Sequence, residues 1–194
     1  MNDQPTDRPR KPAPQLADYP HRVAEIVRFG DLDPQGHVNQ AVFLTYFESG
    51  RVAMFRNPDL SIGVPGVTFV MLRMEVNYMK ELHWPGTIDV GTGVAEFGRS
   101  SFKAAQAIFR DGVCAAAGQA TLVCIDLATR KARPLPQDAI ARLSQWKYRG
   151  QESGIGSQES GQDGRREHAS GVGRHSQSRF SLMRVARLPT RSRR

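Results

Sequence analysis

Five segments of the chain have the hydrophobic patterning of β-strands, and apolar and polar positions alternate most clearly in MLRMEVNYM at 71–79. This segment places four apolar side chains on one face: Leu72, Met74, Val76 and Tyr78. The other four segments are RVAEIVRF (22–29), TIDVGTGVAEF (87–97), SSFKAAQAIFR (100–110) and VCAAAGQATLVCIDL (113–127). An Asp111-Gly112 pair predicts a hairpin turn between the last two segments. The pattern predicts one strand, then four strands in a meander.

Between the first and second strand segments, apolar residues recur at helical spacing from about Gln40 to Arg56, and Pro58 follows. The predicted helix carries a broad apolar face: Phe43, Tyr46, Phe47, Ala53 and Met54. Gly50 lies on this face, where a missing side chain lets a sheet approach closely. A shorter helix is expected within QDAIARLSQW at 137–146. Because an antiparallel sheet needs one face covered, we expect an α+β domain in which the long helix covers five strands.

Composition sets the limits of this domain. Residues 1–18 are rich in proline and are expected to form a flexible arm, which leaves residues 19–146 as the domain. Residues 147–194 are rich in Gly, Ser, Gln and Arg and have no periodic apolar pattern, so we expect a disordered tail. This tail holds 11 basic and 4 acidic residues, hence +7 of the net charge of +8. The remaining chain is nearly neutral, which argues against a specific nucleic-acid partner.

Three sequence features that the chain lacks bear on where in the cell the protein is expected. No window is long and apolar enough for a membrane span, and the N-terminal residues lack the apolar region of a secretory signal. Cys114 and Cys124 match neither a CxxC motif nor a disulfide framework, so we expect buried, reduced thiols. Together these features predict a cytoplasmic protein.

The candidate chemistry lies in the stretch RFGDLDPQGHVNQAVFLTYFESGR at 28–51. Its DLDPQG segment begins like a calcium loop, but the loop's last position is Val42 instead of the glutamate that Ca²⁺ requires. Motifs of serine hydrolases, P-loop proteins and dinucleotide-binding proteins are absent. We therefore expect neither a metal nor an organic cofactor. Any chemistry must come from a carboxylate, a histidine and backbone amides.

Two interpretations fit this stretch. In the simpler one, Asn39 caps the helix and Asp33 to Gly36 form a tight turn. In the other, the unpaired N–H groups at the helix N-terminus polarise a carbonyl group beside a carboxylate, which makes an oxyanion site with a base or nucleophile. The residues alone leave both interpretations open.

The D-x-D-P-x-G-H-V-N-x-A segment closely resembles that of the hotdog-fold thioesterases of the 4-hydroxybenzoyl-CoA thioesterase-like family. The resemblance implies a five-stranded antiparallel sheet wrapped around one long central helix. It makes Asp33 catalytic, as nucleophile or general base, and assigns polarisation of the thioester carbonyl to the N–H of Gln40. His37 and Asn39 fall on the substrate-binding pattern. The family more usually has asparagine at the position of Gln40, but a backbone N–H survives that change.

Other residues of the stretch receive weaker assignments. Asp31 is expected to be structural. Glu48 could face the pocket, but we expect it to pair with Arg51 or Arg56 on the exposed side of the helix. Arg99 falls where related enzymes bind the nucleotide end of CoA, so it is a candidate substrate-binding residue.

The sequence thus predicts an acyl-CoA thioesterase that self-associates as a dimer or tetramer, because hotdog active sites lie between protomers. Two alternatives remain: a non-catalytic hotdog protein that binds acyl groups, and a hotdog hydratase or dehydratase. The acyl chain preference and the choice between CoA and a carrier protein are not readable from these residues.

Overall fold

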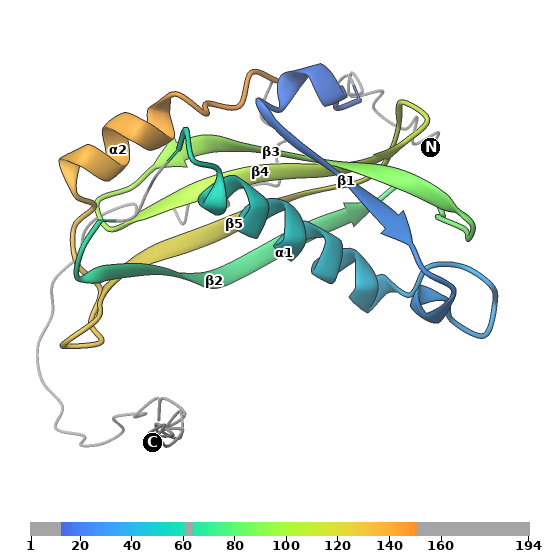
Figure 1. Cartoon of the computed structure of the whole chain (residues 1–194), viewed down its shortest axis with the longest axis horizontal. Coiled ribbons are helices and arrows are strands. Elements are labelled where there is room, and N and C mark those ends of the chain that lie inside the picture. Colours follow the sequence, from blue (N-terminus) through green and yellow to red (C-terminus); the bar gives the residue numbers. More distant parts are fainter. Residues whose placement is uncertain (1–12, 61–63, 151–194) are drawn as a thin grey trace, which may run out of the picture. The chain divides into compact units, whose positions relative to one another are not determined.

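The computed structural model describes residues 13–60 and 64–150, which form one sheet with helices against it (Figure 1). The strands are β1 (His21–Val27), β2 (Val67–Tyr78), β3 (Gly86–Phe97), β4 (Ser101–Arg110) and β5 (Val113–Asp126). The helices are α1 (Gln40–Arg56) and α2 (Gln137–Ser144), with 3-10 turns η1 (Leu16–Asp18) and η2 (Phe29–Asp31). The α+β class and the bounds of the long helix are as predicted. The expected tail lies outside the described residues from 151 onward.

All five strands are antiparallel in the order β1-β3-β4-β5-β2. The predicted four-strand meander is therefore wrong in one respect, because only β3, β4 and β5 are consecutive neighbours and β2 pairs with β5. Residues 79–85 connect β2 to β3. Seven extended residues span roughly 23 Å, whereas three strand spacings need only about 14 Å. The connection is therefore long enough to cross the end of the sheet. In this strand order, β1 and β2 are the two edge strands of the sheet.

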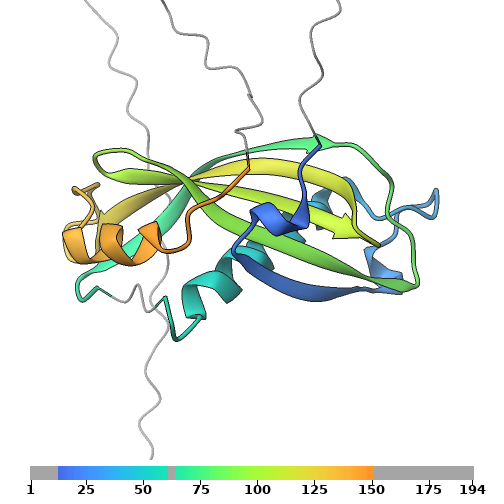
Figure 2. The ribbon, with the colours of Figure 1, turned by 90° about the horizontal axis from the view of Figure 1, so that it is seen from above.

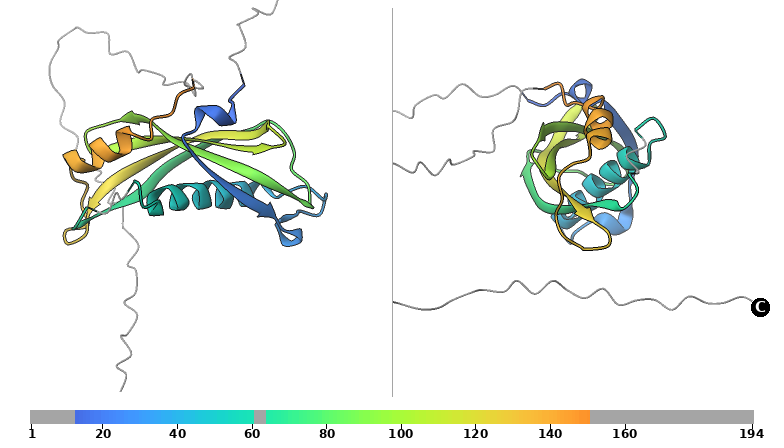
Figure 3. Two further views of the ribbon diagram at one scale, coloured as in Figure 1. Left: turned by 45° about the horizontal axis from the view of Figure 1, so that its top comes forward. Right: turned by 90° about the vertical axis from the view of Figure 1, so that its left-hand side faces the viewer.

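The long helix α1 runs along one face of the sheet (Figure 3). Its buried side chains include the aromatic residues Phe43, Tyr46 and Phe47. The close approach predicted at Gly50 is confirmed, since a Cβ there would lie 2.6 Å from Cγ1 of Val90 on β3. A glycine in mid-helix costs about 1 kcal/mol of helix propensity, and the contact between helix and sheet offsets this cost.

Arg51 departs from the expectation that it lies on the exposed side of α1 as a partner of Glu48. Its side chain is buried, and its guanidinium donates a hydrogen bond to Oε1 of Gln106 on β4. Glu48 is exposed. The helical period explains the difference, because Arg51 follows Gly50 and lies four positions after Phe47 on the side that faces the sheet.

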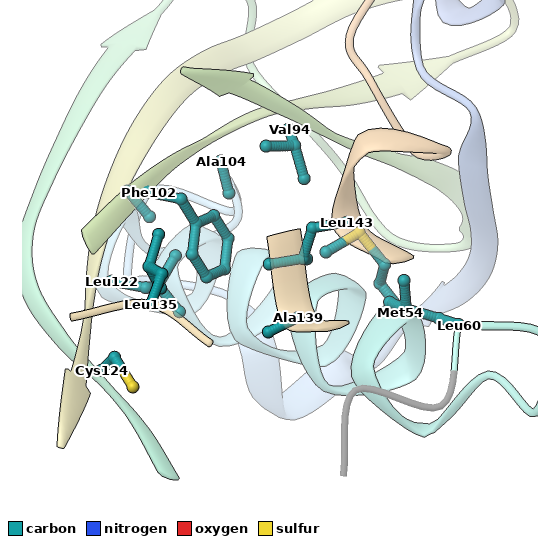
Figure 4. Packing of buried hydrophobic residues seen from close by; sticks show 11 residues of the cluster. Met54, Leu60, Val94, Phe102, Ala104, Leu122, Cys124, Leu135, Ala139 and Leu143 are labelled. Atoms are coloured by element: carbon teal, nitrogen blue, oxygen red, sulfur yellow. The ribbon is translucent and has the colours of Figure 1, made fainter. Parts of the chain in front are cut away.

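Apolar side chains pack into clusters on both faces of the sheet. One cluster lies around the first half of α1 and includes Phe43, Phe47 and Ile108. A second joins the end of α1 to α2, where Met54 and Leu143 lie near one another (Figure 4). A third covers the other face around Tyr19 and Phe109, whose rings meet edge to face at 5.8 Å. Most of the core thus fixes α1 against the sheet.

The edge strand β2 follows the predicted alternation only in part. Met74 and Val76 are half-buried and pack against the clusters under α1, and the ring of Tyr78 meets Phe43 edge to face. Leu72 was predicted on this face but is 74% exposed. The register of β2 against β5 shifts between Met71 and Arg73, so Leu72 lies in a bulge that turns its side chain away from the core.

The packed chain extends past both expected limits of the domain. At the start, η1 lies before residue 19. At the end, Tyr148 donates its N–H to the carbonyl of Val94, and Arg149 donates to that of Asp18. The rings of Tyr19 and Tyr148 lie 4.9 Å apart. The two ends of the described chain therefore lie side by side (Figure 1).

Candidate active site

The loop between β1 and α1 carries Asp33 at the end of the sheet away from α2 (Figures 1 and 2). Asp33 and Gly36 are the first and last residues of a turn, closed by a hydrogen bond from Gly36 N–H to the Asp33 carbonyl. Gly36 has φ = 82°, a left-handed conformation that glycine adopts without a steric penalty. A second backbone bond, from Asp33 N–H to the carbonyl of His37, makes the loop compact.

The Asp33 carboxylate is held by its own loop through one oxygen. Oδ1 accepts hydrogen bonds from the backbone N–H groups of Gln35 (2.9 Å) and His37 (3.2 Å). Among residues 13–60 and 64–150, no hydrogen bond or ion pair reaches Oδ2. The side chain is half-buried. One carboxylate oxygen is thus fixed in orientation, and the other is available to a ligand or water.

The N-terminus of α1 has the predicted cap. Asn39 Oδ1 accepts a hydrogen bond from Ala41 N–H at 2.9 Å, and the Asn39 carbonyl accepts one from Val42 N–H. The N–H of Gln40, the first residue of the helix, has no acceptor among the described residues. It lies at the positive end of the helix dipole, so it can donate to a carbonyl oxygen or oxyanion.

A pocket of about 350 Å³ brings Asp33, His37 and Gln40 together. Its volume falls within the range typical of small-molecule sites. Phe43 and Tyr78 give it an apolar wall, and the hydroxyl of Tyr78 donates to the Gln40 carbonyl at 3.2 Å. A carboxylate and a helix N–H on one concave surface are the groups that acyl transfer by an oxyanion mechanism requires.

Asp31 has the structural role that the sequence predicts. Its Oδ2 accepts hydrogen bonds from the backbone N–H of Arg28 and from the hydroxyl of Tyr46 on α1, both at 2.7 Å. Burial and the Asp31 hydrogen bond raise the pKa of Tyr46. The Asp31 carbonyl also accepts from Asn39 N–H. These bonds fix the loop against the helix and so position the Asp33 turn.

The structure does not bring Arg99 to this pocket. Arg99 is exposed in the turn that follows the end of β3. The Asp33 loop lies at the opposite end of this strand, because it follows Val27 of β1, which pairs with Gly86 at the start of β3. The 12 residues of β3 separate the two ends by roughly 36 Å. Glu48 also lies away from the pocket, exposed on α1.

The pocket also contains residues that the sequence did not indicate as site residues, among them Tyr78, Lys80 and Glu81. Tyr78 belongs to the apolar face predicted for 71–79, so alternation placed its side chain toward the helix but gave no sign of a site. Lys80 and Glu81 follow the strand without any motif. Their position depends on the crossing connection from β2 to β3, which the predicted meander excluded.

A five-stranded antiparallel sheet around one long helix, with a carboxylate beside the helix N-terminus, defines the chain as a hotdog-fold protein of the thioesterase type. The model of the Thioesterase-like superfamily matches residues 27–143, more than half of the chain. The chain therefore belongs to the Thioesterase-like superfamily. It has no match among curated proteins.

Solved structures agree with this fold. The chain is similar to a thioesterase from Thermus thermophilus described as complexed with coenzyme A and Zn, with 37% identity and a TM-score of 0.60 over 67% of this chain and 96% of that one. The YbaW protein of Escherichia coli is 26% identical, with a TM-score of 0.60 over 65% and 98%. The PA5185 protein of Pseudomonas aeruginosa, at 24% identity, shares the fold with a TM-score of 0.63 over 72% and 100%.

Proposed function

We propose that this protein is an acyl-CoA thioesterase that hydrolyses a thioester to the free acid and CoA. The observation that carries the proposal is the shared pocket of Asp33 and Gln40, in which one carboxylate oxygen and one helix N–H have no partner among the described residues. Family membership and the similarity to a Thermus thermophilus thioesterase described as complexed with coenzyme A support it.

Two chemical routes fit the same groups. In the first, the Asp33 carboxylate attacks the thioester carbonyl carbon, CoA leaves as the thiolate, and water hydrolyses the mixed anhydride. In the second, Asp33 removes a proton from a water molecule that attacks the same carbon. In both routes the N–H of Gln40 stabilises the negative charge that develops on the carbonyl oxygen. Asn39 contributes by capping the helix and so fixing that N–H.

Substrate contacts beyond the reacting atoms follow from the pocket walls. Phe43 and Tyr78 offer apolar surface to the first carbons of an acyl group, and His37 and Lys80 offer hydrogen-bond donors or positive charge at the rim. CoA carries phosphates, which Lys80 would attract. An Arg99 contribution to CoA binding requires a second copy of the chain, because Arg99 is remote from the pocket of its own chain.

Self-association is part of the proposal. The outer edge of β2 is unpaired within the described chain, and Val70, Met71 and Leu72 on this strand are 38%, 52% and 74% exposed. Unpaired strand edges with exposed apolar side chains favour pairing with another chain. We expect sedimentation of the full chain to give a dimer or a multiple of one. An active monomer at assay concentration would contradict this part of the proposal.

The activity is tested with acyl-CoA thioesters of short, long and aromatic acyl groups, with release of the free thiol followed over time. Thiol release in step with free acid supports hydrolysis. Binding without thiol release would indicate a non-catalytic acyl-binding protein, and hydration of an enoyl-CoA would indicate a hydratase. The cytoplasmic location stays a prediction. No helix in the described ranges is long and apolar enough to cross a membrane.

A further inference from the structure

A cluster of two imidazoles and one carboxylate lies at the rim of the pocket. Nε2 of His37 lies 3.4 Å from Oε2 of Glu81, and Nε2 of His83 lies 3.7 Å from the same oxygen. The two imidazole rings meet edge to face with centroids 4.9 Å apart. One donor atom from each of the three residues lies within 4.8 Å of the others.

The backbone holds these three side chains together. Leu82, between Glu81 and His83, is buried, and its carbonyl accepts a hydrogen bond of 2.8 Å from the N–H of Val38, the residue after His37. The segment that carries His83 is fixed further by Arg110, whose guanidinium donates to the carbonyls of His83 and Pro85. The donors therefore project from two segments that are tied to each other and to the core.

From this geometry we propose that His37, Glu81 and His83 form a binding site for a first-row divalent transition metal ion such as Zn²⁺. Two histidines and a carboxylate are a known three-ligand set for zinc, which leaves a position for water or a ligand. Zinc bonds of about 2.0–2.2 Å place neighbouring donor atoms about 3.3 Å apart in a tetrahedron. Two of the separations are near this value, at 3.4 and 3.7 Å, and all three lie within 4.8 Å.

The donor set also selects the class of metal. Imidazole nitrogen suits Zn²⁺, Cu²⁺, Ni²⁺ and Co²⁺, whereas Mg²⁺ and Ca²⁺ prefer sites made of oxygen. His37 and Glu81 belong to the wall of the Asp33 pocket, so a bound ion would lie at its rim with an open coordination position. The inference goes beyond the proposed hydrolysis and does not depend on it, because metal binding is measured without any thioester.

The test uses the full chain and a zinc-binding dye. We expect the protein to withdraw Zn²⁺ from the dye, and Mg²⁺ in large excess to leave this binding unchanged. His83→Gln and Glu81→Gln should each weaken Zn²⁺ binding by at least about tenfold. Removing a residue that only supports a metal ligand already lowers metal affinity by about this factor, and removing the ligand itself should lower it at least as much. Both side chains are more than half exposed, so neither change should disturb folding.

Controls separate this cluster from other histidines and carboxylates. The double variant His168→Gln/His175→Gln removes two of the three remaining histidines in the chain, and Asp111→Asn removes an exposed carboxylate in the β4–β5 turn. Both should keep the parental affinity for Zn²⁺. X-ray absorption of the zinc protein should show two imidazole ligands. Undiminished binding in His83→Gln and Glu81→Gln, loss of binding in the His168→Gln/His175→Gln control, or no binding by the parent chain would overturn the proposal.

Discussion

The guanidinium of Arg51 donates a hydrogen bond of 2.7 Å to the side-chain oxygen of Gln106, in the layer between α1 and the sheet. The amide nitrogen of Gln106 in turn donates to the Phe47 carbonyl and to Oγ1 of Thr92. Burial lowers the pKa of Arg51. The negative charge of Glu48 opposes this pKa shift without outweighing burial. No carboxylate in the described ranges lies within ion-pair distance of Arg51, so Gln106 supplies the oxygen acceptor for this buried charge.

Removing Gln106 should therefore destabilise the fold through Arg51. We expect Gln106→Leu to lower the free energy of unfolding by about 2–3 kcal/mol, because a hydrogen bond to a charged group is lost in a buried setting. Urea denaturation of the parent and the variant measures this change. The pocket does not contain Gln106, so any folded fraction should keep its activity.

The double variant Arg51→Met/Gln106→Leu tests the cause. Replacing both partners by apolar side chains removes the unpaired charge together with its acceptor, so its loss of stability should be smaller than the sum of the two single losses. Strict additivity would mean that the two side chains do not depend on one another.

The end of the packed chain gives a second prediction. A chain that ends at Gly150 should keep the melting temperature of the full chain. A chain that ends at Trp146 loses the packing of Tyr148 on Tyr19 and the pairing of Lys147 and Tyr148 with Val94. We expect a cost of about 2 kcal/mol, or a melting temperature lower by roughly 4–8 °C. Equal melting temperatures for the two truncated chains would contradict the role given to Tyr148.

Alkaline pH should destabilise the protein. Burial raises the pKa of the Cys114 thiol from 9.0 to about 11, and burial also raises the pKa of Tyr19 and of Tyr46. A group with a raised pKa in the folded state contributes stability below its unfolded pKa and loses it as the pH rises toward the folded value. The free energy of unfolding should thus fall between about pH 9 and pH 11, by up to roughly 2–3 kcal/mol from Cys114 alone.

The variant Cys114→Ala isolates the thiol. Its free energy of unfolding should fall less than that of the parent between about pH 9 and pH 10, and the tyrosines should still cause a fall above that range. Urea denaturation at a series of pH values gives both curves. Identical curves for the two proteins would show that ionisation of Cys114 is not coupled to folding.

The local elements of the fold were predictable because each leaves a local pattern. The helix from Gln40 to Arg56 follows from apolar spacing and a capping asparagine, and Gly50 stands out on its apolar face. Strand order was not predictable in the same way. The pairing of β2 with β5 depends on the long connection at 79–85, and nothing in its composition distinguishes a crossing from a turn. The bulge that exposes Leu72 also leaves no mark in an alternating sequence.

In the candidate site, too, some residues were predictable from the sequence and others are brought together only by the fold. Asp33, His37, Asn39 and Gln40 are close in sequence, so their resemblance to a family motif was enough to bring them together. Glu81 joins His37 only through the fold, because the Val38–Leu82 hydrogen bond links segments that lie more than forty positions apart. Arg99 shows the opposite case, in which sequence position suggests a contact that the length of β3 prevents within one chain.

The central claim is that the Asp33 carboxylate carries out the chemistry, and Asp33→Asn tests it most directly. Asparagine keeps an oxygen that can accept from the N–H groups of Gln35 and His37, so the turn should persist. Asp31→Asn is the matched control, since Asp31 bonds to Tyr46 and Arg28 instead of facing the pocket. Circular dichroism and melting temperature verify that both variants fold.

The deciding measurement is the turnover number for acyl-CoA hydrolysis of the two variants beside the parent chain. We predict that Asp33→Asn lowers turnover by at least about a hundredfold, the usual lower range for losing a catalytic acid–base group, with a much smaller change in KM. Asp31→Asn should retain most of the parental turnover. Near-parental turnover in Asp33→Asn would contradict the account, and only together with an inactive Asp31→Asn would it make Asp31 the catalytic carboxylate.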